Sequence, residues 1–147
     1  MSARWAAVCV AALAAACAKP AAAPPAPVAQ VAAHSAVVLT AAGMHFSATW
    51  RFLAPRVGEI FAVDVDLADV AGQPLAAAAV TLAATMPAHG HGMMTDPEVR
   101  QTAAGHWHAE GFKLHMHGTW ELAVEVTANG QKERLTAPWQ QAPAAMD

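Results

Sequence analysis

The sequence predicts an all-β fold, an immunoglobulin-like β-sandwich of about seven strands. Short segments in which apolar and polar residues alternate recur along the chain, and turn residues separate them. Alternation with a period of two turns one face of each strand to the core and the other to solvent, as in an antiparallel sandwich. Three tryptophans fall on the apolar faces and predict an aromatic core around Trp50, Trp120 and Trp139.

The N-terminal residues are predicted to be a targeting signal and a tether. Residues 1–16 form a short apolar run after one arginine, which is the layout of a lipoprotein-type signal peptide. The stretch that ends at Cys17 resembles the bacterial lipobox, so Cys17 is the expected lipid attachment site, and ordinary cleavage after Ala16 is the alternative. Residues 17–36 would then be the lipidated cysteine and an Ala/Pro-rich tether. We expect a lipid anchor on the periplasmic side of the cell envelope, with the outer membrane favoured by Ala18.

The sandwich domain is predicted over residues 37–139, with a disordered tail at 140–147. The segment 77–86 is apolar enough for a helix or a strand, and its alternation favours a strand. Asn129-Gly130 is the strongest short hairpin signal in the chain. The candidate strands cover residues 37–40, 45–53, 59–67, 77–86, 99–102, 106–114, 119–127 and 131–139.

Composition argues against several classes of function. A net charge of −3 and a pI near 6.2 do not favour a nucleic-acid-binding protein. The chain has no G-x-S-x-G motif and no phosphate-binding loop, and its carboxylates are scattered, so we expect no enzyme.

Histidine and methionine are concentrated in two glycine-containing segments. The first carries Met86, His89, His91, Met93 and Met94, and the second carries His115, Met116 and His117. Both cysteines precede the predicted mature domain, so a metal site there would lack a thiolate. Imidazole with thioether is a donor set that suits copper, as Cu(I) or Cu(II), better than zinc, calcium or magnesium. Met86 at a strand end also fits a plain core residue, and an exposed loop of this composition also fits one that binds nothing.

A further pair, His106 and His108, lies within a predicted strand and shares one face. That face would also carry Phe112 and Leu114 unless Gly111 inserts a bulge that changes the register. A structural or surface role is the favoured interpretation of this pair.

The run from Met86 to Gly92, followed by the strand Gly118-Thr119-Trp120-Glu121-Leu122, resembles the YtkA-like family of exported bacterial domains, which are related to FixH-type proteins. The resemblance covers about residues 39–135 and implies an Ig-like sandwich with a link to copper and respiratory metal handling. It singles out Met86, His89, His91 and Met116, while His117 stands where the family pattern has proline.

The sequence therefore predicts a lipid-anchored envelope protein that binds copper through the two loops, as a chaperone, buffer or tolerance factor. The alternative is an interaction module without metal, whose loops dock onto a membrane metal transporter or an oxidase complex during assembly.

Overall fold

The computed structural model describes residues 34–76 and 78–143 of the protein. These residues form two antiparallel sheets and one turn of 3-10 helix, so the predicted β-sandwich is confirmed. The elements are β1 (Ala36–Ala42), β2 (Phe46–Leu53), β3 (Ile60–Asp69), β4 (Ala79–Met86), η1 (Pro87–His89), β5 (His91–Gly92), β6 (Glu98–Ala103), β7 (His106–Lys113), β8 (Gly118–Ala128) and β9 (Gln131–Gln141).

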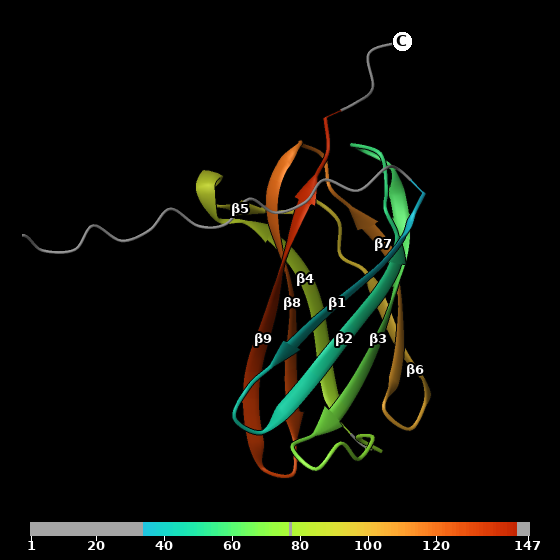
Figure 1. Cartoon of the computed structure of the whole chain (residues 1–147), viewed down its shortest axis with the longest axis vertical. Coiled ribbons are helices and arrows are strands. Elements are labelled where there is room, and N and C mark those ends of the chain that lie inside the picture. The colour runs from blue at the N-terminus through green and yellow to red at the C-terminus, as the bar shows by residue number, and fades with distance from the viewer. Residues whose placement is uncertain (1–33, 77, 144–147) are drawn as a thin grey trace, which may run out of the picture.

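The sheets have the strand orders β1-β2-β3-β7-β6 and β5-β4-β8-β9 (Figure 1). Their inner faces form one core, because alternate residues of the long strands are buried as the period-two pattern predicts. Trp50 and Trp120 are completely buried and Trp139 nearly so, which confirms the predicted aromatic centre. The edge of Trp139 meets the ring of Phe52 from the other sheet at 5.3 Å between ring centroids.

The hairpin between β8 and β9 forms at the predicted turn. Asn129 and Gly130 have φ values of 52° and 73°, and two positive values in succession define the turn type that matches strand twist. β9 then continues past residue 139, where the disordered tail was expected to begin. Gln141 is buried, and its Nε2 donates to the Pro55 carbonyl at 2.8 Å, so these hydrogen bonds hold the strand end in place.

One end of the sandwich, called the tip below, consists of η1 with β5, the loop between β7 and β8, and the loop between β2 and β3. The Gly58 N–H donates to the Leu114 carbonyl at 2.8 Å and connects the last two. In Figure 1 the tip is the upper end of the molecule, where β9 also ends.

The predicted signal peptide, Cys17 and most of the tether lie outside the described residues, as do residues 144–147. Within the described ranges, no helix has the length and apolar character needed to cross a membrane.

Candidate metal centre

The first loop of the tip reverses the chain within a few residues. Pro87 begins a single 3-10 turn, and Gly90 ends it in the left-handed conformation, with φ 67°, where a glycine has no steric penalty. The Gly90 N–H donates to the Met86 carbonyl at 3.1 Å. The chain then pairs with β4 again, so that His91 lies opposite Met86 at the edge of the sheet.

The second loop carries the chain from β7 in one sheet to β8 in the other. Leu114 is completely buried at its start, and the Trp120 indole N–H donates to the Met116 carbonyl at 3.0 Å. These two contacts hold the segment between them, and they place His115 beside the first loop.

Three imidazoles follow one another across the two loops. The ring centroids of His89 and His91 are 5.8 Å apart, and those of His91 and His115 are 5.2 Å apart in a stacked arrangement. Trp120 meets the His115 ring edge-on at 5.4 Å. Because His89 is exposed, His91 and His115 are half-buried and Trp120 is buried, the rings form a row from solvent to core.

The hydrogen bonds of the two inner imidazoles suit metal ligation. His91 Nδ1 is 3.2 Å from the Gly92 carbonyl oxygen, which only accepts, so Nδ1 carries the proton and the Nε2 lone pair is free. His115 Nδ1 is buried without a hydrogen-bond partner. A buried unpaired nitrogen costs about 1–3 kcal/mol, and a ligand bound to it would remove that cost.

The predicted thioether ligands occupy different depths. Met86 is buried under the loops, Met93 and Met116 are partly buried against the core, and Met94 is 84 % exposed. His117 is exposed and points to a position outside the row of rings that the ring contacts define. Met116 is therefore the predicted sulfur donor that lies on the same loop as His115 and is not fully enclosed.

The donor set of the tip is uncharged. Residues 86–95 and 114–120 include no Asp, Glu, Lys or Arg. Neutral imidazole and thioether suit a soft monovalent ion such as Cu(I), which needs no carboxylate to balance its charge. As the side chains stand, no three His, Cys, Asp or Glu residues of the described ranges converge in an arrangement that could hold a metal ion, so a copper site needs thioether sulfur or a turn of an imidazole ring.

A sequence model of the YtkA-like family matches residues 54–125, which include both tip loops and the Trp120 strand. Residues 54–125 thus belong to the YtkA-like family. The matched segment is shorter than the resemblance seen in the sequence, and it runs from the end of β2 into β8. The chain matches no curated protein and no solved structure.

The other histidine pair of the YtkA-like protein lies far along β7 from the tip. Gly111 adopts φ 97°, and the register between β3 and β7 shifts beside it. This is the bulge that the sequence left open, and it turns Phe112 into the core while His106 and His108 stay on the outer face. The pair is therefore separate from the tip.

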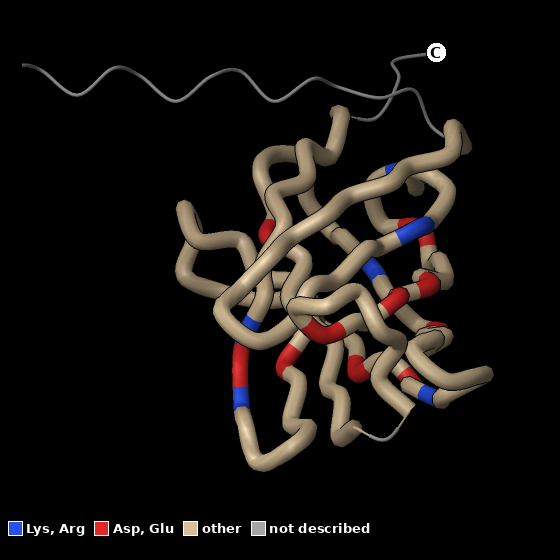
Figure 2. The backbone as a smooth tube through the Cα atoms, turned by 60° about the horizontal axis from the view of Figure 1, so that its bottom comes forward, with Lys and Arg blue, Asp and Glu red and all other residues tan. Residues whose placement is uncertain are grey.

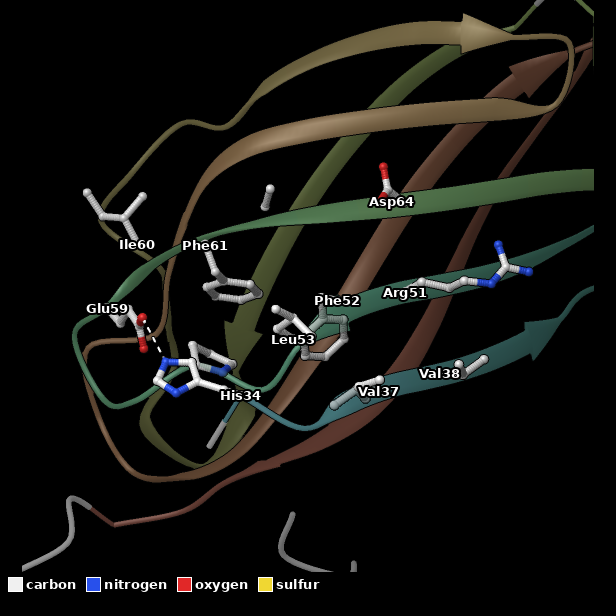
Figure 3. A pocket seen from close by; sticks show the side chains of 13 residues that line it. His34, Val37, Val38, Arg51, Phe52, Leu53, Glu59, Ile60, Phe61 and Asp64 are labelled. Atoms are coloured by element: carbon white, nitrogen blue, oxygen red, sulfur yellow. Dashed lines mark hydrogen bonds and ion pairs between the residues drawn. The ribbon is translucent and has the colours of Figure 1, made fainter. Parts of the chain in front are cut away.

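An apolar groove of about 550 Å³ runs along β1, β2 and the start of β3, and sequence reasoning did not identify it. Val38, Leu53 and Ile60 line it and are 58–66 % exposed. Figure 3 shows His34 and Glu59 at one end and Arg51 with Asp64 at the other. The Arg56 backbone N–H, and then the His34 side chain, donate to Glu59 and lower the pKa of its carboxyl.

Two contributors to the tip also carried no sequence signal. The Gly92 carbonyl orients His91, but every residue has a carbonyl group and only the fold determines which one an imidazole meets. Trp120 was predicted as a core residue, which it is, and its edge also forms the inner wall of the imidazole row. Alternation along β8 predicts burial and gives no information about which loop lies above the ring.

Proposed function

We propose that this YtkA-like protein binds copper at the tip, through His91 and His115 with Met116 beside them. The stacked pair of imidazoles carries the proposal, because one ring has its Nδ1 hydrogen-bonded to a carbonyl and the other has a buried nitrogen without a partner. Held imidazoles lose less conformational freedom when they ligate, and the second hydrogen bond of a ligating histidine fixes the nitrogen that it presents.

The outer residues have supporting roles in this proposal. His89 is exposed at the start of the row and would meet an incoming ion first. Met93 and Met94 provide further thioethers around the entrance, His117 is a reserve imidazole, and Met86 would need to leave the core to ligate. The chemistry that copper would supply is reversible binding of a soft ion, as expected of a chaperone, a buffer or a tolerance factor.

The proposed setting is the periplasmic side of the cell envelope, with Cys17 lipidated and the outer membrane favoured. This part of the proposal rests on the apolar run, the lipobox-like segment and the Ala/Pro-rich stretch of the sequence. Labelling with a radioactive fatty acid tests it. Incorporation that disappears in a Cys17→Ser variant is expected, and an unlabelled wild-type protein would contradict lipidation.

A copper titration of the full chain against a chromophoric Cu(I) chelator tests the site. We expect one tight equivalent in the wild type. The double variant His91→Ala/His115→Ala should lose more affinity than the roughly 10–100-fold that removal of a hydrogen-bonding partner near a metal causes, because it removes ligands themselves. The double variant His106→Ala/His108→Ala removes the same number of imidazoles and should retain wild-type Cu(I) affinity. Equal affinity in the tip variant would refute the site.

The pH dependence of copper binding follows from the ligand type. An imidazole must be unprotonated to ligate, so copper affinity should fall between about pH 7 and about pH 5. The same competition titration at several pH values measures this fall. An affinity that stays constant down to about pH 4 would exclude histidine ligands.

The apolar groove favours a second candidate function, docking onto a membrane transporter or an oxidase complex under assembly. Its exposed Leu53 and Ile60 would contact such a partner. Co-purification from detergent-solubilised membranes should then be lost in Leu53→Asp and unchanged in His91→Ala. Association that depends on the tip histidines and not on Leu53 would contradict docking through the groove.

A further inference from the structure

A second group of metal-ligating side chains lies on the outer face of the five-stranded sheet. It consists of Asp64, Asp66, His106, His108 and Glu110, called the β3–β7 cluster below. Asp64 lies opposite His108 and Asp66 opposite His106 in the antiparallel register, so the side chains face one another in pairs. Figure 2 shows acidic and basic residues close together on neighbouring strands.

Both imidazoles of the cluster are held at the same ring nitrogen. His106 Nδ1 contacts an Asp66 carboxylate oxygen, and His108 Nδ1 is 2.6 Å from Asp64 Oδ1. A carboxylate that accepts from one nitrogen of a histidine orients the ring and makes the other nitrogen a better ligand. The cluster therefore has two imidazoles whose Nε2 atoms are set up as metal ligands.

The Nε2 atom of His108 faces another acceptor. It lies 3.2 Å from Glu110 Oε1. With Nδ1 donating to Asp64, a neutral ring directs its Nε2 lone pair at the Glu110 oxygen, and the two lone pairs repel. A cation between the two atoms turns this repulsion into attraction.

The spacing of these two atoms fits a tetrahedral metal centre. Zinc binds histidine nitrogen and carboxylate oxygen at about 2.0–2.2 Å, so two ligands at the tetrahedral angle lie roughly 3.3–3.5 Å apart. The 3.2 Å between His108 Nε2 and Glu110 Oε1 is close to this value. No third donor converges with them as the side chains stand, and His106, two residues away on the same face, is the nearest imidazole that a side-chain rotation would bring in.

The surrounding charges also favour a divalent cation. Asp64, Asp66 and Glu110 face the two arginines that bond to the cluster, Arg51 at Asp66 and Arg100 at Glu110, so one negative charge is left over. The cluster contains imidazole and carboxylate and no thioether, a donor set that suits zinc and not Cu(I).

We propose that the β3–β7 cluster binds one Zn²⁺ ion through His108 Nε2 and Glu110, with Asp64 as the positioning residue and His106 as third ligand. The site is independent of the copper site at the tip, because the two share no residue. One tip binds a soft monovalent ion with neutral donors, and one sheet face binds a borderline divalent ion with charged donors.

Zinc titration of the full chain, by calorimetry and by competition with a chromophoric chelator, tests this inference. We expect one equivalent of Zn²⁺, with binding lost in His108→Ala and in Glu110→Gln. Asp64→Asn should weaken it by about 10–100-fold while both ligands remain. His45→Ala, which removes an exposed histidine of the β1–β2 turn, is the matched control and should bind zinc as the wild type does.

Two results would overturn the proposal. One is a wild-type protein that binds no Zn²⁺ while its melting temperature shows that it is folded, since a proton on His108 Nε2 then accounts for the geometry. The other is zinc binding that survives in both His108→Ala and Glu110→Gln. The tip variant His91→Ala/His115→Ala should keep zinc and lose Cu(I), so a failure of the copper site and a failure of the zinc site are separate observations.

Discussion

Gly118 sets how closely the β7–β8 loop approaches Met86. It has φ 122°, and a Cβ atom at this position would lie 2.5 Å from the Met86 methyl group. Met86 is buried, so its side chain cannot simply swing into solvent. We expect Gly118→Ala to destabilise the fold by about 1–3 kcal/mol through backbone strain and repacking. Urea unfolding measures the change.

Gly130 provides the matched control for this substitution. It also has a positive φ, of 73°, but no atom lies within 4 Å of the position of an added Cβ. Gly130→Ala should therefore show the backbone strain alone, about 1–2 kcal/mol. A Gly118→Ala variant no less stable than Gly130→Ala would contradict the contact with Met86. The double variant Met86→Ala/Gly118→Ala should be less than additive, because the two side chains share one contact.

The turn between β1 and β2 depends on one carboxylate from β9. The backbone N–H groups of Met44, His45 and Phe46 all donate to Glu133, at 2.6, 3.1 and 3.1 Å. Burial by itself raises the pKa of Glu133, but these three hydrogen bonds together outweigh burial and hold the pKa below the ordinary value of 4.5. The turn is thus linked to the opposite sheet by an interaction that needs the ionised form.

The lowered pKa of Glu133 determines how its contribution depends on pH. A carboxyl with a lower pKa in the folded state contributes stability above its unfolded pKa, and that contribution is lost as the pH falls through the folded value. Glu133→Gln should therefore be less stable than the wild type at pH 7, and the difference should shrink as the pH falls below about 4.5. Urea unfolding across this range measures it, with Glu98→Gln on β6 as the control for loss of an exposed charge. A difference that is constant with pH would contradict the linkage.

Strand β7 shows how far an element is predictable from its sequence. Alternation gives its length and the burial of Trp107, but the pattern before Gly111 and the pattern after it require opposite faces. A glycine in a strand is compatible with a bulge and with a regular strand, and pairing with β3 decides between them. The strands and turns follow from local residue patterns, whereas the face that His106 and His108 occupy does not.

Considered as a whole, the sandwich brings together at the tip residues that no local pattern relates. Periodicity identifies the strands before and after each loop, and turn residues identify the loops. The 5.2 Å approach of His91 and His115 arises because β7 and β8 belong to different sheets and the connection between them must cross over the end of β4. The candidate ligands were therefore predictable by type, and their grouping was predictable only as a hypothesis. Burial of Met86 and exposure of His117 likewise depend on this crossing.

The position of the tip between the sheets gives copper binding a consequence for the stability of the entire domain. An ion held by His91 and His115 connects the edge strand β5 to the β7–β8 connection, so it binds the folded state and stabilises both sheets together. At a free copper concentration one hundred times Kd, binding contributes about 2.7 kcal/mol, which corresponds to roughly 10 °C in Tm for a domain of this size. Binding of copper by His and Met in the unfolded chain would reduce this rise to several degrees. Calorimetric melting with and without Cu(I) measures the shift. It should vanish in His91→Ala/His115→Ala and persist in His106→Ala/His108→Ala, whereas a shift of equal size in both variants would mean that copper stabilises the protein from somewhere other than the tip.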